Sequence, residues 1–369
     1  MKKIVTVLGA RPQFIKASVV SKAIEQAGKM QEIVVHTGQH FDSNMSDLFF
    51  QELGMNTPKH HLQIGGGWHG EMTGRMLVAI ERVLMEEKPD AVMVYGDTNS
   101  TLAGALAAVK LGIPVAHVEA GLRSFNMAMP EEINRILTDR ISRWLFTPTE
   151  AAECHLRGEG VEDEKIISVG DVMYDVALYQ GAQSEAASEI LLKLGLTKGS
   201  YALATIHRAE NTDKPERLAE VVGGLVLLAE TIPVVWPLHP RTRGVLGQHS
   251  VLQSQASRLC LVDPVGYLDM VKLERSAGLI VTDSGGVQKE AFFHQVPCVT
   301  LRAETEWTET VALGWNRLCP THEPRQLAQT CLEALHTSGR NGKPYGAGDA
   351  AQKIAAFLAT RIGPHCEKN

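Results

Sequence analysis

The sequence lacks several features by which common protein classes are recognised. No apolar stretch approaches the ~18 residues that a membrane-spanning helix needs. The apolar run after Met1, Ile4–Leu8, is too short for the core of a signal peptide. We therefore expect a cytoplasmic protein that is not inserted in a membrane.

Cysteine pairs and an excess of positive charge are also missing. The six cysteines form no C-x-x-C motif and have no neighbouring pair of histidines, which argues against a zinc site and favours reduced thiols. Lys and Arg number 36 against 42 Asp and Glu, a net charge of −6. This balance gives no electrostatic reason to expect a nucleic acid or an acidic membrane as partner. Any phosphate must therefore be bound by a local site.

The remaining composition is that of a folded globular protein, with 44% apolar, 21% charged and 5% aromatic residues. A length of 369 residues favours two domains. Short apolar segments alternate with amphipathic stretches in two series. The first series comprises Ile4–Leu8, Glu32–His36, Ala91–Tyr95, Val115–Val118, Trp144–Phe146 and Ile166–Val169, and the second comprises Tyr201–Ile206, Pro233–Pro237, Arg258–Val262, Gly278–Thr282 and Pro297–Leu301.

Uninterrupted apolar strands are buried on both faces, and their alternation with helices predicts parallel sheets covered by helices. We expect an α/β fold of two Rossmann-like, doubly wound domains that face a cleft. Residues 1–178 form the first domain and residues 179–369 the second. The pattern over 350–362 predicts a last helix, and whether it packs back on the first domain is left open.

Charged residues follow three predicted strands of the first domain. Arg11 and Lys16 lie at the turn and helix start after the first strand, which suits an anion, although solvent-exposed charges would look the same. Asp97 and Glu119 end successive strands, and Asp97 could equally be a helix cap. Glu131 follows Pro130 at a helix start, a position that propensity alone explains. Three acids at one edge of a sheet would shift one another's pKa values, as functional carboxylates do.

The second domain carries its strongest signal in Thr282–Glu290, a strand that runs into a Gly-rich turn and a helix. The amides after Ser284, at Gly285 and Gly286, predict an anion site at the helix N-terminus. Glu290 is placed to accept hydrogen bonds from sugar hydroxyls. His207 follows another strand, where it could also be an ordinary loop residue.

Two motif matches are rejected on context. Asp-Ser-Gly-Gly at Asp283 resembles the surroundings of the chymotrypsin nucleophile, but those proteases are β-barrels. Gly65–Gly70 matches G-x-G-x-x-G, but the preceding segment, His60–Ile64, is a poor strand, so no nicotinamide cofactor is expected. A Gly-rich loop at the cleft is the better interpretation.

Seven motifs occur in a fixed order: Gly9-x-Arg11-Pro12-x-x-x-Lys16, Gln39-His40, Gly96-Asp97-Thr98, His117-Val118-Glu119-Ala120-Gly121-Leu122-Arg123, Pro130-Glu131-Glu132-x-Asn134-Arg135, His207-Arg208-x-Glu210 and Thr282-Asp283-Ser284-Gly285-Gly286-x-Gln288-x-Glu290. Together they closely resemble the non-hydrolysing UDP-N-acetylglucosamine 2-epimerases, which have the two-domain GT-B architecture. The resemblance covers nearly the whole chain.

The resemblance implies an isomerase that interconverts UDP-GlcNAc and UDP-ManNAc for surface polysaccharide precursors. Such enzymes eliminate UDP to leave 2-acetamidoglucal, and then add UDP back after protonation of C2 from the other face. The resemblance also implies a homodimer whose partner molecule is a UDP-sugar, with no cofactor and no metal.

Carried over by position, the resemblance assigns roles to the residues above. Asp97, Glu119, Glu131 and His207 form the catalytic set, and which carboxylate removes the C2 proton is left open. Arg11, Lys16 and Arg135 lie near the sugar and diphosphate; Ser284, Gly285 and Gly286 hold the diphosphate, and Glu290 the ribose. Gln39, His40 and Arg75 correspond to a second, regulatory UDP-GlcNAc site, beside which Asp42 replaces a commoner Gln.

The sequence also departs from common members of that family. Gln13-Phe14 stands where an acid and a small residue are usual, the loop Ser124–Met129 is short, and Trp307-Thr308 replaces a frequent Arg-Pro. These departures resemble the branch that acts on UDP-2,3-diacetamido-2,3-dideoxy-glucuronate, which is the alternative substrate. A GT-B glycosyltransferase and a non-catalytic sugar-nucleotide binder are more distant alternatives, since neither needs three clustered acids.

Overall fold

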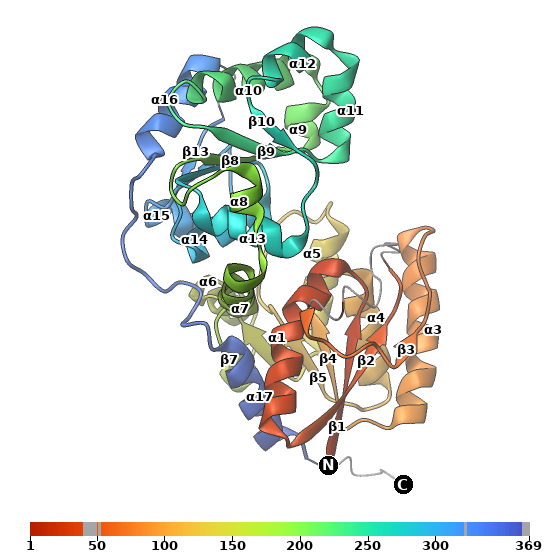
Figure 1. The fold of residues 1–369 in the computed structure, drawn as a ribbon. Coiled ribbons are helices and arrows are strands. Elements are labelled where there is room, and N and C mark those ends of the chain that lie inside the picture. Colours follow the sequence, from red (N-terminus) through yellow and green to blue (C-terminus); the bar gives the residue numbers. More distant parts are fainter. Residues whose placement is uncertain (40–49, 51–52, 321–322, 364–369) are drawn as a thin grey trace. The chain divides into compact units, whose positions relative to one another are not determined.

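Two units make up the chain in the computed structural model, which describes residues 1–39, 50, 53–320 and 323–363. Unit 1 comprises Met1–Val176 with Lys343–Asn369, and unit 2 comprises Ala177–Gly342. Both units consist of a parallel β-sheet covered by helices (Figure 1). In the described part of the chain no helix is long and apolar enough to cross a membrane.

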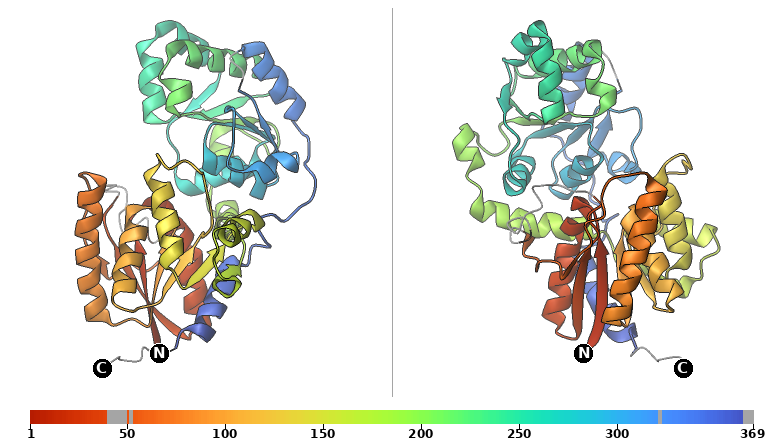
Figure 2. Two further views of the ribbon diagram at one scale, coloured as in Figure 1. Left: turned by 180° about the vertical axis from the view of Figure 1, so that it is seen from behind. Right: turned by 90° about the vertical axis from the view of Figure 1, so that its right-hand side faces the viewer.

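Unit 1 contains a seven-stranded sheet in the order β3-β2-β1-β4-β5-β6-β7. Its strands are β1 Lys2–Leu8, β2 Met30–His36, β3 His60–His61, β4 Ala91–Tyr95, β5 Val115–Val118, β6 Trp144–Thr147 and β7 Ile166–Ser168. The apolar runs that predicted strands become buried on both faces because helices lie on each side (Figure 2). The edge strand β3 was not predicted, since its two histidines carry no apolar pattern.

The helices of unit 1 are α1 Arg11–Ala27, α3 His69–Glu87, α4 Asn99–Lys110, α5 Pro130–Ile141, α6 Glu150–Gly158, α7 Val172–Ala187 and α17 Ala350–Arg361, with α7 continuing into unit 2. Helix α4 lies between α3 and α5, and α17 packs against α1. Met76 and Ile80 of α3 contribute to the apolar core against β1 and β4.

The last helix belongs to unit 1, where an aromatic contact and a pair of capping hydrogen bonds hold it. Phe357 lies edge-on to Phe146 of β6, with ring centroids 5.5 Å apart. The carboxylate of Asp175 accepts hydrogen bonds from the backbone N–H groups of Ala350 (3.2 Å) and Ala351 (2.8 Å), which caps the start of α17. The chain therefore leaves unit 1 within α7 and returns to it near Lys343.

Unit 2 contains a six-stranded sheet in the order β10-β9-β8-β11-β12-β13. Its strands are β8 Ala202–Thr205, β9 Val234–Pro237, β10 Cys260–Val262, β11 Leu279–Thr282, β12 Cys298–Thr300 and β13 Asn316–Leu318, and its helices are α8 Ile190–Leu194, α9 Ala209–Thr212, α10 Pro215–Leu228, α11 Pro240–Gln248, α12 Ser250–Ala256, α13 Tyr267–Ser276, α14 Gly285–Phe293, α15 Thr308–Ala312 and α16 Pro324–Ala334. Strand β13 is half polar and was not predicted.

The strand order reverses once in each sheet, between β1 and β4 in unit 1 and between β8 and β11 in unit 2. At such a switch point the connections after the two neighbouring strands run to opposite faces of the sheet. This opens a crevice at the carboxyl edge of the sheet, where ligands of this fold class bind. The predicted site residues should therefore be sought after β1, β4, β8 and β11.

Candidate functional site

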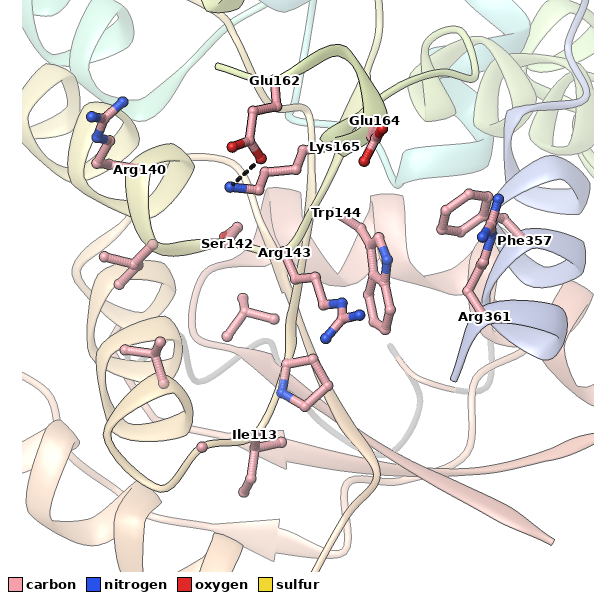
Figure 3. A pocket seen from close by; sticks show the side chains of 15 residues that line it. Ile113, Arg140, Ser142, Arg143, Trp144, Glu162, Glu164, Lys165, Phe357 and Arg361 are labelled. Atoms are coloured by element: carbon pink, nitrogen blue, oxygen red, sulfur yellow. Dashed lines mark ion pairs between the residues drawn. The ribbon is translucent and has the colours of Figure 1, made fainter. Parts of the chain in front are cut away.

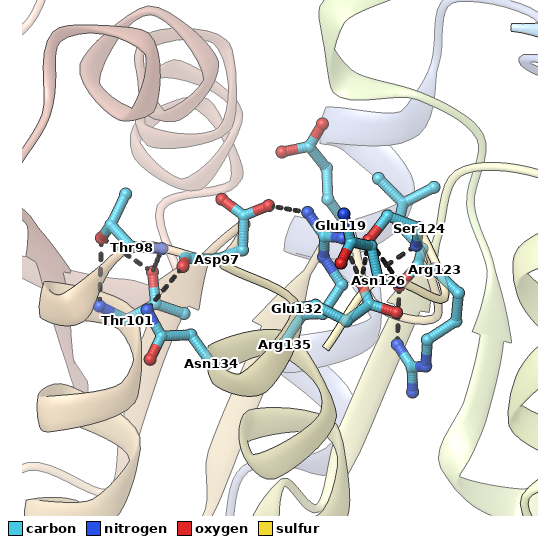
Figure 4. Close-up of polar contacts among 12 residues, drawn as sticks. Asp97, Thr98, Thr101, Glu119, Arg123, Ser124, Asn126, Glu132, Asn134 and Arg135 are labelled. Carbon is cyan, nitrogen blue, oxygen red and sulfur yellow. Dashed lines mark hydrogen bonds and ion pairs between the residues drawn. The ribbon is translucent and has the colours of Figure 1, made fainter. Parts of the chain in front are cut away.

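Asp97 lies directly after β4 at the switch point of unit 1, and it does not cap the following helix. Thr98 is the N-cap of α4: its Oγ1 accepts a hydrogen bond from the backbone N–H of Thr101 at 3.3 Å. The Asp97 carboxylate instead forms an ion pair with Arg135 of α5 (Figure 4). The helix-cap interpretation of Asp97 was therefore wrong.

Glu119 follows β5 and lies beside Asp97. Its backbone is left-handed, with φ at 66°, and its carboxylate is 6% exposed and paired with the ammonium of Lys16. A Cβ added to Gly96 would lie 3.5 Å from Glu119 Oε2, and Gly96 itself has φ at 61°. The left-handed backbone of Gly96 therefore allows the turn, and the Glu119 carboxylate lies close to it, next to Asp97.

Lys16 carries the counter-charge of this pair. Burial lowers the pKa of Lys16, but the carboxylates of Glu119, Asp171 and Asp97, with Glu119 foremost, together raise the pKa by more. The net pKa lies above the ordinary value, so the ammonium remains charged. Two carboxylates after neighbouring strands thus each have a cation of their own, Lys16 for Glu119 and Arg135 for Asp97.

Arg135 also pairs with Glu132, a residue that was not among the predicted site residues. Glu132 is fully buried and accepts hydrogen bonds from the backbone N–H groups of Ser124 (2.9 Å) and Phe125 (2.8 Å). Burial raises its pKa, but these N–H groups, the Ser124 hydroxyl and Arg135 lower it below the ordinary value. Glu132 holds the short loop after Arg123 in place and orients Arg135.

Glu131 and Arg11, two further predicted site residues, lie at helix starts in unit 1. Glu131 is exposed in the first turn of α5, and in the described part of the chain it forms no hydrogen bond or ion pair with Asp97 or Glu119. Arg11 is the half-buried first residue of α1. The i, i+3 spacing of Glu132 and Arg135 on α5 is the sequence signal that could have identified Glu132.

In unit 2 the buried carboxylate of Asp283, after β11, organises the turn after β8. It accepts hydrogen bonds from the backbone N–H groups of His207 (3.1 Å) and Arg208 (3.0 Å) and from Asn211 Nδ2 (3.0 Å). The ring nitrogen Nδ1 of His207 lies 3.6 Å from Asp283 Oδ1, and the His207 side chain is 41% exposed. Asp283 thus fixes the backbone from which the His207 ring projects.

Helix α14 follows β11 and Asp283, with Ser284 as its N-cap residue and Gly285 and Gly286 as its first two residues. The Ser284 side chain makes no cap hydrogen bond, and its backbone N–H donates to Thr282 Oγ1 at 2.9 Å. A Cβ added to Gly285 would lie 3.9 Å from a guanidinium nitrogen of Arg208. The positive end of α14 and Arg208 therefore suit an anion.

Trp307 supports this loop from the segment before α15. Its indole Nε1 donates to the carbonyl of Gly285 at 2.8 Å, and the ammonium of Lys289 lies 4.2 Å from its ring centroid. Glu306, the neighbour of Trp307, is neutralised by both guanidinium nitrogens of Arg302, at 2.9 and 3.0 Å. Trp307 is a contact of the Gly-rich turn that residue type alone did not reveal.

Glu290 lies in the second turn of α14, partly buried. Burial raises its pKa, although the charge of Lys289 opposes this. It therefore lies in the same unit, and on the same helix, as the predicted anion-binding turn.

Two of the three residues of the predicted regulatory site, Gln39 and Arg75, lie at the same loop: a Cβ added to Gly65 would lie 3.5 Å from the carbonyl oxygen of Gln39, and Arg75 donates to the carbonyl of Gly65 at 3.3 Å. Gln39 Oε1 accepts hydrogen bonds from the backbone N–H (2.9 Å) and hydroxyl (2.7 Å) of Ser100. Arg75 donates to the carbonyl of Gly66 at 3.0 Å. His40 lies outside the described residues. Among described residues no cluster of His, Cys, Asp and Glu could hold a metal ion.

A cavity of about 910 Å³ lies at the opposite edge of the unit 1 sheet (Figure 3). Val115 and Trp144, the first residues of β5 and β6, line it together with Arg140 and Arg361. The two arginines stand in the last turns of α5 and α17, where a cation offsets the negative end of a helix. Helix stability accounts for these arginines, so this cavity is not the candidate active site.

Comparison with known proteins shows the family to which a chain with this carboxylate cluster in unit 1 and this Gly-rich turn in unit 2 belongs. The family model described as UDP-N-acetylglucosamine 2-epimerase matches residues 22–359. The chain belongs to this epimerase family. Its members are isomerases, and the GT-B-type α/β fold of the two units is the fold of its solved members.

Three relatives of this epimerase are informative. A Pseudomonas aeruginosa protein named UDP-2,3-diacetamido-2,3-dideoxy-D-glucuronate 2-epimerase is 54% identical, over 97% of this chain and 99% of its own length. Methanocaldococcus jannaschii UDP-GlcNAc 2-epimerase, solved with UDP-GlcNAc and UDP, is 44% identical with a TM-score of 0.81, covering 97% of this chain and 99% of that one. Staphylococcus aureus MnaA with UDP is 32% identical with a TM-score of 0.83, covering 100% and 99%.

Proposed function

We propose that this epimerase inverts C2 of a UDP-linked 2-acetamido sugar by eliminating UDP and adding it back. The observation that carries the proposal is the pair of carboxylates beside Gly96 at the switch point of unit 1: Asp97 follows Gly96 in the chain, and Glu119 lies next to Gly96 in space. A base must take the C2 proton and an acid must return one from the other face. Two carboxylates with separate cations can play these two roles.

The elimination balances as follows. The C2 proton passes to a carboxylate, the C1–O bond breaks with its electron pair on the departing UDP, and C1 and C2 become doubly bonded. Protonation of C2 from the opposite face and attack of a UDP oxygen on C1 give the epimer. Helix α14 and Arg208 supply donors for the leaving diphosphate, a type of stabilisation that contributes ~10²–10³ in rate for one donor.

The remaining site residues take their proposed roles from this chemistry. Ser284, Gly285 and Gly286 bind the diphosphate, and Glu290 binds the ribose hydroxyls. His207, Arg11 and Lys16 lie near the sugar and diphosphate, and Glu131 is a third acid–base candidate. We further propose a cytoplasmic homodimer that supplies precursors of a surface polysaccharide.

The sugar we favour is 2,3-diacetamido-2,3-dideoxy-D-glucuronate. The Pseudomonas aeruginosa relative that bears this name is 54% identical over nearly the full length of both chains. UDP-GlcNAc is the second candidate, because the Methanocaldococcus jannaschii enzyme, 44% identical, was solved with UDP-GlcNAc bound. The two sugars differ at C3 and C6, so a difference in rate would report on contacts to those positions.

The test is incubation of the protein with each UDP-sugar in D₂O, followed by proton NMR. We expect deuterium at C2 and appearance of the C2 epimer with no acceptor present, and a higher kcat/KM for the diacetamido uronate. Exchange with UDP-GlcNAc alone would overturn the substrate assignment. Absence of C2 exchange with both sugars, or sugar transfer that needs an acceptor, would overturn the epimerase proposal.

A further inference from the structure

His117 of β5 is completely buried and bridges two elements of the carboxylate site in unit 1. Its Nδ1 lies 2.7 Å from Oδ1 of Asp139 on α5, and its Nε2 lies 2.7 Å from the backbone carbonyl oxygen of Gly96 at the end of β4. Both ring nitrogens therefore have an oxygen partner at hydrogen-bonding distance.

The chemistry of the two partners determines where the ring protons are. A backbone carbonyl only accepts, so Nε2 must carry a proton to bond Gly96. Asp139 accepts hydrogen bonds at Oδ2 from the N–H of Gly121 (3.1 Å) and from Arg123 (2.7 Å), which favours its ionised form. An ionised carboxylate also only accepts, so Nδ1 carries a proton too. A histidine with both nitrogens protonated is an imidazolium cation.

The charges around His117 compensate one another. Asp139 faces it from α5 and pairs with Arg123, and Arg123 pairs in turn with Glu159. With His117 charged, these four groups carry two positive and two negative charges, which removes the large cost of an unpaired buried charge. The site's own pairs, Lys16–Glu119 and Arg135–Asp97, stand beside this network.

Gly96 connects His117 to the two carboxylates of the site. His117 binds the carbonyl of Gly96, Glu119 Oε2 occupies the space next to its α-carbon, and Asp97 is the next residue. Gly96 has a left-handed backbone, which glycine adopts readily, and its N–H donates to the carbonyl of Val118 at 3.0 Å. A strong donor to its carbonyl would fix the direction in which Asp97 leaves the strand.

We propose that His117 is a positioning residue, held as a buried imidazolium, that anchors the Gly96 carbonyl and thereby sets Asp97 against Glu119. The effect on turnover rests on the proposed epimerase reaction. The protonation state does not, and it can be measured without substrate.

The first experiment is ¹H–¹⁵N NMR of protein labelled with ¹⁵N-histidine at pH 7.5, where histidines of the unfolded chain are mostly neutral. We expect one histidine whose two ring nitrogens both have the ¹⁵N chemical shifts of protonated nitrogens. This signal should be missing from the spectrum of a folded His117→Gln or His117→Asn variant. A His117 signal with one unprotonated nitrogen would overturn the proposal. So would a shared proton that resides on Asp139.

The second experiment compares these two variants kinetically. The Gln side chain places its N–H near the position of Nε2 and can still donate to Gly96, whereas the Asn side chain reaches only the position of Nδ1. Because a misplacement of about 1 Å can cost ~10²-fold in rate, we expect His117→Asn to lose roughly 100-fold in kcat and His117→Gln roughly tenfold. UDP affinity should be unchanged in both, because the proposed UDP site lies in unit 2.

Equal kcat values for the two variants, or a His117→Asn enzyme with the wild-type kcat, would overturn the positioning role. If neither His117 variant folds, the wild-type NMR spectrum still decides the protonation state. The variant Asp139→Asn, which removes the counter-charge of the ring, then identifies the signal: we expect the doubly protonated histidine to be lost from its spectrum. If wild-type enzyme shows no C2 exchange, the proposed function fails while the NMR result stands.

Discussion

The ammonium of Lys16 and the carboxylate of Glu119 form an ion pair that joins the second turn of α1 to the end of β5. Both side chains are largely shielded from water, so each is the main counter-charge of the other. Removing one partner alone would leave a buried charge without compensation, which is far more costly than losing a surface ion pair.

Glu119→Gln should abolish C2 exchange while leaving UDP affinity intact. The amide keeps the size of the carboxyl group and its oxygen can still accept from Lys16, so the lost charge lowers stability without removing the contact, but the amide cannot take a proton from C2. Deuterium incorporation and calorimetric titration with UDP measure the two properties separately. Glu86→Gln is the matched control and should keep C2 exchange, because Glu86 is an exposed glutamate on α3 of the same unit, outside the carboxylate site. Exchange that persists in Glu119→Gln would remove Glu119 from the catalytic set.

Gln13→Leu should destabilise unit 1 more than Gln13→Glu does. Gln13 Oε1 accepts from the backbone N–H groups of Gly9 (2.8 Å) and Ala10 (3.1 Å), and its Nε2 donates to the carbonyl of Tyr95 (2.7 Å). Leucine leaves both N–H groups without a partner, at a cost of ~1–3 kcal/mol for each buried group. Glutamate keeps both N–H contacts and loses the bond to Tyr95, while the hydroxyls of Thr98 (3.1 Å) and Thr101 (3.0 Å), which accept from Nε2, can rotate to donate instead.

Urea unfolding of the two Gln13 variants at neutral pH measures this order. Gln13→Glu also tests the site, because the bond to Tyr95 holds α1 against the strand that leads to Asp97. A Leu variant as stable as the wild type would show that water replaces the amide at this turn.

The sequence predicted the sheets well because the buried strands are uninterrupted apolar runs, and such runs have few alternative structures. The two strands that it missed, β3 and β13, lie at sheet edges. An edge strand pairs with one neighbour only and is partly exposed, so it can contain polar residues and lack an apolar pattern. The position of α17 in unit 1 depends on Phe357 and Asp175, contacts made after a long excursion of the chain.

The candidate site was predicted as residue types at strand ends, but not as pairs. Asp97 could be a helix cap or a site carboxylate, and only the contact of Thr98 with Thr101 decides between them. Glu131 and Glu132 are adjacent acids in the same helix turn, and the helix phase turns Glu132 inward and leaves Glu131 exposed. Long-range partners of this kind are set by packing, which composition and spacing do not encode.

Trp307→Phe should weaken UDP binding by about 1 kcal/mol, roughly fivefold in Kd. Phenylalanine keeps an aromatic face for Lys289 but loses the hydrogen bond from the indole to the carbonyl of Gly285. The matched control is Trp315→Phe, which loses a similar hydrogen bond, from Nε1 to the carbonyl of Arg340 at 3.1 Å.

Calorimetric titration with UDP compares the two tryptophan variants. The Trp315 variant should bind UDP like the wild type, because its indole supports a segment away from the Gly-rich turn. Equal losses in both variants would mean that unit 2 responds to any lost indole contact, and that Trp307 has no particular role at the turn.

His36→Asn should reduce the dependence of stability on pH between about 4 and 6.5. Burial lowers the pKa of His36 to about 4, and the nearby His61 adds to this effect. Nδ1 accepts from the backbone N–H of Gly38 at 2.9 Å, which requires that nitrogen to be unprotonated. The folded chain thus holds the ring neutral, while the unfolded chain binds a proton below about 6.5. The contribution of neutral His36 to the free energy of unfolding is complete above pH 6.5. As the pH falls toward 4, roughly 3 kcal/mol of it is lost.

Asparagine at position 36 keeps an acceptor for Gly38 but does not titrate, so its unfolding free energy should fall less between pH 6.5 and 4. His294 in unit 2 also has its pKa lowered to about 4, by burial and by Arg275, so part of the wild-type slope should remain in His36→Asn and disappear in the double variant with His294→Asn. Urea denaturation at pH 4.5, 5.5 and 7 measures the slopes. An unchanged slope in the double variant would show that other groups, and not these two rings, bind the protons on unfolding.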